Sequence, residues 1–275
     1  MALDLADHLF AALADLRVHP TGKRIRALVD GNVVVDSTRA RVVWEPRRIV
    51  PSYAVPVADV IGRLTPADPS PGAARPVTIG NGPPVLDPRT GFAFHTTPGQ
   101  AFDLTVGSIT LPGAAFVPGD PDLDGMAILD FDAFDEWREE DEVLVGHARD
   151  PFKTVDTRSS SRRVMISIGD VVVADSSRSI MLFETYLPTR YYLPRDDVRM
   201  DVLAPSDTTT VCAYKGRATY WTATVGATTE PDVAWSFEEP HNYAAAVPGR
   251  VCFFNERVDI TVDGTAQPRP RTPWS

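Results

Sequence analysis

The chain repeats a block of charged and small residues at a constant distance. The first and last positions of the block recur 139 residues later, since 175 − 36 and 184 − 45 both equal 139. An internal repeat of this length predicts two diverged copies of one domain, each of which buries its own core. The repeated residues are Asp36, Ser37, Arg39 and Glu45 in the first block and Asp175, Ser176, Arg178 and Glu184 in the second.

The repeat divides the 275 residues into four parts. We expect an N-terminal helix over residues 1–23, a first domain over 24–150, a connector over 151–162 and a second domain over 163–275. The connector is predicted from turn signals at its two ends, Asp150-Pro151 and Ser159-Ser160-Ser161. The helix is predicted from leucines at helical spacing, which are Leu5, Leu9, Leu13 and Leu16.

Twenty-five prolines and eighteen glycines favour short strands joined by turns over long helices. Residues 163–168 alternate loosely and end at Gly169-Asp170, which is typical of a hairpin. A second hairpin is predicted around Lys215-Gly216, and a short acidic helix over residues 134–140. We therefore predict a mainly β protein made of two tandem, compact antiparallel β domains with a short N-terminal helix.

Charge and cysteine content exclude several classes of protein. With 27 basic and 37 acidic residues the net charge is −10, which disfavours binding to nucleic acid. The sequence contains no run of eighteen apolar residues, so we predict no membrane-spanning helix. Asp4 and Asp7 stand where a signal peptide carries positive charge, so we expect a cytoplasmic protein. Two cysteines and five scattered histidines indicate neither a disulfide framework nor a metal site, so we expect no cofactor.

The second copy resembles a family known as domain-of-unknown-function family 427, which is also labelled nucleotidyltransferase-like. The resemblance implies a compact antiparallel β fold of the β-tent type. It also implies that the domain can occur in tandem, as is familiar in this family. The first copy matches less well, because His95, Thr97 and Pro98 stand where the family pattern has Cys, Tyr and Lys. The residues that carry the resemblance are Glu184, Tyr191-Tyr192-Leu193-Pro194, Asp197-Val198, Cys212-Ala213-Tyr214-Lys215-Gly216 and Ala234-Trp235.

Three residues of the second copy are candidates for chemistry. A lysine three positions from a thiol favours the thiolate, so Lys215 is expected to activate Cys212 as a nucleophile. Glu184 is then the candidate proton acceptor. The alternative is structural, because a free cysteine often only packs in a core and a shared glutamate often only binds backbone. Cys252, in an apolar strand, is predicted to lie in the core.

Aromatic residues are dense in the second copy, and Tyr192, Tyr214 and Trp235 are the candidate walls of a binding pocket. The alternative is an ordinary β core, where aromatic residues are also favoured. Three functions stay open: binding of a small molecule in the second domain, catalysis through Cys212 with Lys215 and Glu184, and a scaffold for protein interactions. The first copy is expected to be a degenerate partner that packs against the second or covers its pocket. The repeated Asp175 and Arg178 are expected to form the scaffold.

Overall fold

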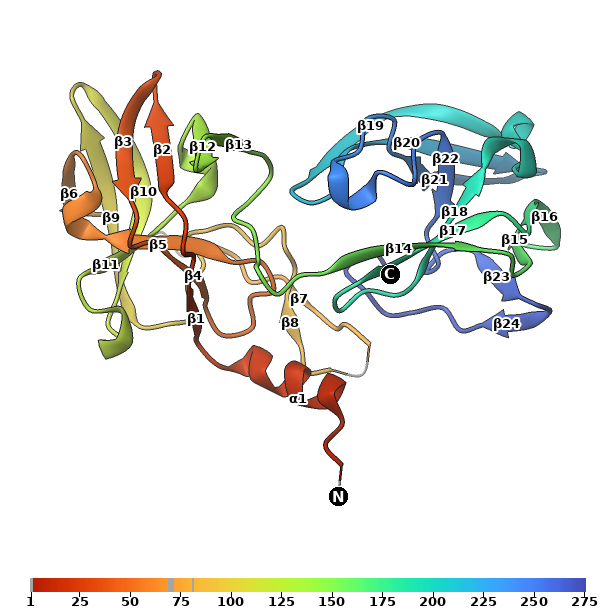
Figure 1. The fold of residues 1–275 in the computed structure, drawn as a ribbon, viewed down its shortest axis with the longest axis horizontal. Coiled ribbons are helices and arrows are strands. Elements are labelled where there is room, and N and C mark those ends of the chain that lie inside the picture. Colours follow the sequence, from red (N-terminus) through yellow and green to blue (C-terminus); the bar gives the residue numbers. More distant parts are fainter. Residues whose placement is uncertain (1, 69–71, 81) are drawn as a thin grey trace. The chain divides into compact units, whose positions relative to one another are not determined.

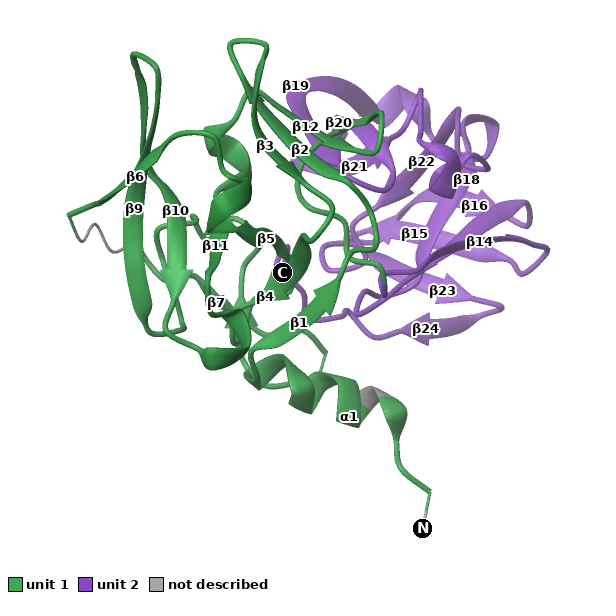
Figure 2. Ribbon diagram, turned by 60° about the vertical axis from the view of Figure 1, so that its left-hand side comes forward, with its two compact units in different colours: residues 1–151 green, residues 152–275 purple. Residues whose placement is uncertain are grey.

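The computed structural model describes residues 2–68, 72–80 and 82–275 of the chain (Figure 1). It divides into two compact units, unit 1 at Met1–Pro151 and unit 2 at Phe152–Ser275 (Figure 2). Neighbouring strands of every sheet run antiparallel, which confirms the prediction of a mainly β, antiparallel fold. The short N-terminal helix is also confirmed, as α1 (Leu5–Ala11) followed by the 3-10 turn η1 (Ala12–Ala14).

Unit 1 contains a seven-stranded sheet, a four-stranded sheet and a two-stranded ribbon. The seven-stranded sheet has the order β1 (Arg17–Pro20), β4 (Arg41–Trp44), β5 (Ser52–Pro56), β11 (Met126–Leu129), β10 (Ile109–Pro118), β9 (Gly99–Val106), β6 (Arg63–Pro66). The four-stranded sheet has the order β13 (Glu142–Leu144), β12 (Glu136–Glu139), β2 (Ile25–Val29), β3 (Asn32–Ser37). The ribbon and the 3-10 turns are β7 (Pro76–Val77), β8 (Val85–Leu86), η2 (Val57–Asp59), η3 (Pro121–Leu123) and η4 (Phe131–Ala133).

Unit 2 contains a seven-stranded and a four-stranded sheet. The seven-stranded sheet has the order β14 (Val155–Ser160), β17 (Ser179–Glu184), β18 (Arg190–Pro194), β22 (Arg250–Phe253), β21 (Thr228–Ser236), β20 (Gly216–Val225), β19 (Leu203–Cys212). The four-stranded sheet has the order β16 (Val171–Ser176), β15 (Val164–Ile168), β23 (Asp259–Val262), β24 (Thr265–Gln267). The 3-10 turns are η5 (Arg195–Asp197), η6 (Met200–Val202) and η7 (Asn242–Ala244).

The two units have the same strand order. When the strands of each unit are counted along the chain without the ribbon β7–β8, the first strand of unit 1 corresponds to the first strand of unit 2, and so on. Corresponding strands then occupy the same places in the two seven-stranded sheets and in the two four-stranded sheets. The register agrees as well: Pro56 pairs with Met126 across β5 and β11, and Pro194 pairs with Arg250 across β18 and β22. These are positions that the sequence repeat aligns.

The seven-stranded sheet of unit 2 has a cluster of buried apolar residues on each of its two faces. Alternate residues of a strand point to opposite faces. In β17, Met181 packs in the cluster between the two sheets, whereas Leu182 packs in a second cluster on the other face, which we call the outer face. Trp221 likewise packs toward the inner cluster and Tyr220 toward the outer face. The buried residues of the outer face are Ile180, Leu182, Tyr192, Ala218, Trp235, Phe237, Ala244, Val247, Cys252 and Phe254.

Ion pairs at the surface hold the repeated Asp and Arg side chains in both units. In unit 2, Asp175 pairs with Arg163 at 2.6 Å, and Arg178 pairs with Asp197, which also accepts a hydrogen bond from Ser176 at 2.6 Å. Unit 1 contains the same arrangement at the aligned positions. Both pairs join neighbouring turns and strands, as expected for scaffold residues. The pairs of unit 1 are Arg24 with Asp36 and Arg39 with Asp59.

Residues 134–140 form no helix, so the prediction of a short acidic helix was wrong. Strand β12 covers Glu136–Glu139 instead and pairs with β2 and β13. Trp137 and Glu139 are buried, whereas Glu136 and Arg138 are only partly buried, which is the period-two pattern of a strand. Because the segment contains many acidic residues, this alternation could not be recognised in the sequence.

Two edge strands lie in segments for which the sequence patterns predicted no strand. Strand β1 follows the N-terminal helix within residues 1–23, and β14 lies within the predicted connector 151–162. Both strands are short or polar and lie at the edge of a seven-stranded sheet, where one side of the strand has no neighbour to impose a hydrophobic alternation. No helix formed by residues 2–68, 72–80 and 82–275 has the length and apolarity that crossing a bilayer requires.

Candidate functional site

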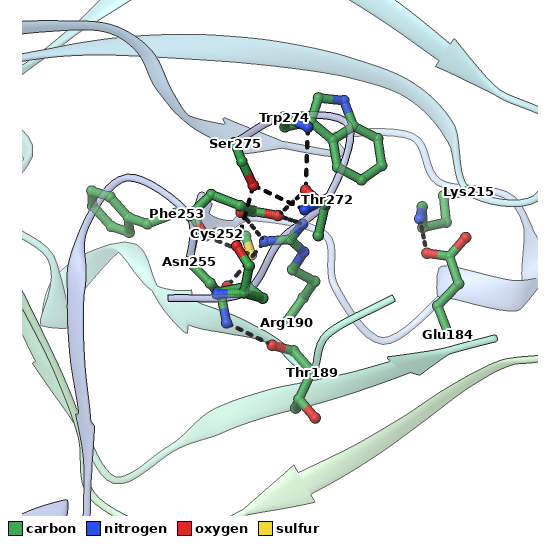
Figure 3. A network of polar contacts seen from close by, with 12 residues as sticks. Glu184, Thr189, Arg190, Lys215, Cys252, Phe253, Asn255, Thr272, Trp274 and Ser275 are labelled. Atoms are coloured by element: carbon green, nitrogen blue, oxygen red, sulfur yellow. Dashed lines mark hydrogen bonds and ion pairs between the residues drawn. The ribbon is translucent and has the colours of Figure 1, made fainter. Parts of the chain in front are cut away.

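Polar side chains emerge on the otherwise apolar outer face of unit 2. Glu184 ends β17 two residues after Leu182 and therefore points to the same face. Arg190 and Tyr192 reach this face from β18, and Trp235 reaches it from β21. Figure 3 shows Glu184 and Lys215 beside the polar network of Arg190. The outer face of unit 2 thus combines charged groups with aromatic walls.

Glu184 binds two ammonium groups at once. Its Oε2 accepts a hydrogen bond from Nζ of Lys215, and its Oε1 lies 3.1 Å from Nζ of Lys153. Lys153 also donates to the carbonyl of Thr185 at 3.1 Å. The side chains are 4% exposed for Glu184, 14% for Lys215 and 18% for Lys153, so water screens these charges only weakly.

The electrostatics of this cluster favour the charged forms of Glu184 and Lys215. Burial alone would raise the pKa of Glu184, but Lys215 and Lys153 outweigh it and hold the pKa below its usual value. Burial alone would lower the pKa of Lys215, but the Glu184 carboxylate outweighs it and holds the pKa above its usual value. Lys215 is therefore an ammonium ion at neutral pH and carries no free amine for nucleophilic attack.

The turn between β19 and β20 fixes the position of Lys215. The carbonyl of Lys215 accepts a hydrogen bond from the backbone N–H of His241 at 3.1 Å. Gly216 follows with φ of 94°, in the left-handed region that favours glycine. A Cβ at Gly216 would lie 3.1 Å from the carbonyl oxygen of Glu239 and 3.3 Å from the backbone nitrogen of His241. A side chain at position 216 would therefore need both the left-handed backbone and a shift of the neighbouring 239–241 backbone by a few tenths of an ångström.

We expect Gly216→Ala to destabilise unit 2 more than Gly226→Ala does. Both glycines have positive φ, which costs an alanine about 1–2 kcal/mol. Gly226 has open space around it, so its variant should lose only that amount. At Gly216 the contact with the 239–241 backbone adds a clash. Urea denaturation of the two variants measures the difference, and equal losses would contradict this account of the turn.

The structure brings together some of the residues that the sequence predicted. Lys215 meets Glu184 directly, and Nε1 of Trp235 donates a hydrogen bond to the Tyr192 hydroxyl at 3.1 Å. Burial raises the pKa of Tyr192 well above its usual value, so this hydroxyl stays neutral. Tyr214 is buried and lies edge-on to Tyr243, with ring centroids 6.2 Å apart.

The two cysteines differ in environment. Cys212 ends β19 as a partly buried free thiol, and its ionised form is one of the charges that raise the pKa of Lys215. Cys252 is fully buried on the outer face, as predicted, and burial raises the pKa of its thiol to about 12. Only Cys212 therefore combines partial exposure with a neighbouring cation.

Sequence patterns missed a second charged group on this face, the ion pair of Arg190 and Glu256. The pair is bidentate, with both contacts at 2.7 Å, and its side chains are 6% and 0% exposed. Asn255, which Figure 3 shows beside Arg190, accepts from it at 3.1 Å. The Thr272 hydroxyl donates to Glu256 at 2.5 Å. The guanidinium also lies 5.4 Å from the ring centroid of Trp235. Such a pair is held by geometry and by aromatic stacking together.

Unit 1 holds its aligned glutamate, Glu45, in a different way. Glu45 accepts from the backbone N–H groups of Thr96 at 2.9 Å and Thr97 at 3.1 Å, and its Oε2 lies 3.0 Å from Nδ1 of His95. The His95 ring stacks on Phe116, with centroids 3.6 Å apart. Unit 1 therefore contains an organised polar cluster of its own, in which backbone donors and an imidazole replace the two lysines.

No group of three or more His, Cys, Asp or Glu side chains within the described ranges is arranged to hold a metal ion. A mainly apolar hollow of about 370 Å³ lies in unit 1, and none of the predicted site residues is among those that line it. Its lining residues are Leu13, Ala14, Arg47, Pro83, Pro84 and Val85.

A comparison with curated proteins finds no match to this chain. A comparison with family models finds one for the second unit. Residues 156–264 match the model of the family described as "Domain of unknown function (DUF427)", which supports the resemblance that the sequence of this unit shows to that family.

Proposed function

We propose that unit 2 binds a small molecule on its outer face, at Glu184 and Lys215, with Tyr192, Tyr214 and Trp235 as neighbouring aromatic groups. Small-molecule sites usually combine aromatic walls with a few placed polar groups. The proposal includes that the two units are tandem copies of one β-tent domain and that the first copy has diverged from this role.

The observation that carries the proposal is the contact of two lysines with one carboxylate on an apolar face. Apolar residues of the same volume often stabilise a fold as well as a buried ion pair or better, so a fold does not need an ion pair at this place. Lys215 is moreover held by a turn in which Gly216 has a left-handed φ of 94° and close backbone neighbours, both of which favour glycine. Charged groups that are positioned at such cost are typical of a functional site.

Equilibrium dialysis of the full chain against a mixture of metabolites tests the proposal. The chain is expected to retain at least one compound that the Lys215→Met variant does not retain. The Lys23→Met variant is the matched control, because Lys23 forms an ion pair with Glu139 in unit 1, at 2.7 Å. Retention of no compound, or equal retention by all three proteins, would contradict the proposal.

Catalysis through Cys212 is the second candidate, and Lys153 favours it. An ion pair between Lys215 and Glu184 alone would cancel the help that Lys215 gives to a thiolate. Because Lys153 binds the other oxygen of Glu184, the cluster keeps one positive charge in excess beside Cys212. A positive charge beside a cysteine is one route to a reactive thiol, and this is the basis of the second candidate.

We expect iodoacetamide to alkylate Cys212 faster than Cys252 at neutral pH. The buried Cys252 serves as the internal control, since its thiol has a pKa of about 12. Lys215→Met should move the pH midpoint of the Cys212 reaction upward, because the excess charge is lost. The measurement is the labelling rate of each thiol by mass spectrometry as a function of pH. A midpoint that Lys215→Met leaves unchanged would remove Cys212 as a nucleophile.

A further inference from the structure

The geometry points to a ligand that carries an oxyanion, a carboxylate or a phosphate group, which lies between the ammonium groups of Lys153 and Lys215. This inference rests on the proposed function of unit 2 and names the chemical class of its ligand.

The first argument is the charge of the cluster. Lys153 and Lys215 contribute two positive charges and Glu184 one negative charge, so that one positive charge is in excess (2 − 1 = 1). All three side chains are less than one fifth exposed. A charge that is shielded from water is costly unless an opposite charge accompanies it. An anion on the outer face would complete the pairing.

Apart from Cys212, the groups that the described residues place around the cluster do not supply that anion. Glu256 is occupied by both guanidinium nitrogens of Arg190 and by Thr272, and this pair is neutral by itself. Burial keeps the hydroxyl of Tyr192 and the thiol of Cys252 in their neutral forms. After Glu184, the ionised form of Cys212 is the next largest charge that raises the pKa of Lys215. The counter-charge is therefore either an external anion or the Cys212 thiolate, and the experiment below separates them.

The second argument is the use of lysine. The chain has 27 basic residues, of which only Lys23, Lys153 and Lys215 are lysines, and two of these three meet at Glu184. An ammonium group has three N–H donors and suits a small anion as a point charge. Contacts within the described chain occupy one donor of Lys215 and two of Lys153, which leaves 6 − 3 = 3 donors for a ligand.

Unit 1 provides the contrast. The sequence repeat aligns Lys215 with Pro98, and the 139-residue offset aligns Lys153 with Ala14 (153 − 139 = 14). Glu45 is satisfied instead by backbone N–H groups and by His95. The nearby Arg48 places its Nε 3.8 Å from Oε2 of Glu45, and its terminal nitrogens donate to carbonyl oxygens of the loop that carries His95, so the cation beside Glu45 is one guanidinium and not two ammonium groups. The excess of ammonium groups is thus specific to the unit for which we propose binding.

Nuclear magnetic resonance of the full chain with 13C at the lysine ε-carbon tests this inference, because three lysines give three signals. The signals are assigned with Lys→Arg variants and followed during titration with sodium phosphate, sodium acetate or sodium chloride at constant ionic strength. We expect saturable shifts of the Lys153 and Lys215 signals with phosphate, acetate or both, and none at Lys23. The stronger of the two anions identifies the group that the ligand carries.

Two variants give the inference its control. Lys153→Met should weaken the binding of the anion by at least about tenfold, because one of two charge-assisted contacts is lost. Lys23→Met should leave the binding unchanged, and the remaining signals report whether each variant is folded. Signals at Lys153 and Lys215 that respond to Cys212→Ser but to no anion would overturn the inference and assign the counter-charge to the thiolate. Retention of uncharged metabolites in the dialysis, without anion binding, would likewise overturn it while the proposed function stands.

Discussion

Arg190→Met is expected to destabilise unit 2 by about 3–5 kcal/mol, because it leaves the carboxylate of Glu256 buried without its partner. Glu256 is fully buried and burial alone would raise its pKa, so that Arg190 is what keeps it charged. The variant also loses the stacking of the guanidinium on three aromatic rings. These rings are Trp235, Phe254 and Trp274, with centroids 5.4, 5.8 and 5.8 Å from the guanidinium carbon.

Urea denaturation, followed by hydrogen exchange in peptides of unit 2, measures this loss. Arg178→Met is the matched control, since Arg178 pairs with Asp197 as closely but is 61% exposed, and its loss should be far smaller. The double variant Arg190→Met, Glu256→Met should be more stable than Arg190→Met alone, because it removes the orphaned carboxylate. Equal losses for the Arg190 and Arg178 variants would contradict the assignment of Arg190 to the core.

The fold could be predicted from the sequence where local patterns repeat. The hairpins at Gly169 and around Lys215-Gly216 have the alternation and turn residues that the structure contains. The repeat of Glu45 and Glu184 likewise matched equivalent places, since Glu184 ends β17 and Glu45 directly follows β4. Both features depend on contacts within a few residues or on comparison of the two halves. Strands β1 and β14 were not predicted, because an edge strand has only a weak hydrophobic alternation.

The charged groups of the site were only partly predictable. Lys215 and Glu184 could be found because they belong to residues that carry a family resemblance. Arg190 and Glu256 are 66 positions apart and show no periodicity, so their pairing depends on the tertiary fold. One signal existed: Arg190 lies in phase with Tyr192 in an otherwise apolar strand, where an unpaired charge would be costly. Lys153 lies in the segment that was interpreted as a connector, which concealed its role.

Glu184→Gln is expected to destabilise unit 2 by about 3–5 kcal/mol at pH 7, because two ammonium groups lose their shared carboxylate. The effect should depend on pH in a defined direction. The pKa of Glu184 in the folded protein lies below its usual value, which an unfolded chain shows at about 4.3. The carboxylate therefore contributes stability that is fully present above the unfolded pKa and is lost as the pH falls through the folded pKa.

The measurement is the free energy of unfolding of both proteins in urea between pH 7 and pH 3. Other carboxylates titrate in this range, among them Glu256, whose pKa is also lowered, but they are common to both proteins and cancel in the difference. The difference between the wild-type chain and Glu184→Gln should be constant above about pH 5 and should shrink toward pH 3. Glu136→Gln, which removes a half-exposed partner of Arg138 in unit 1, should show a small difference at every pH. A difference for Glu184→Gln that is equally small at pH 7, or that grows toward low pH, would mean that Glu184 does not hold the two lysines as a carboxylate.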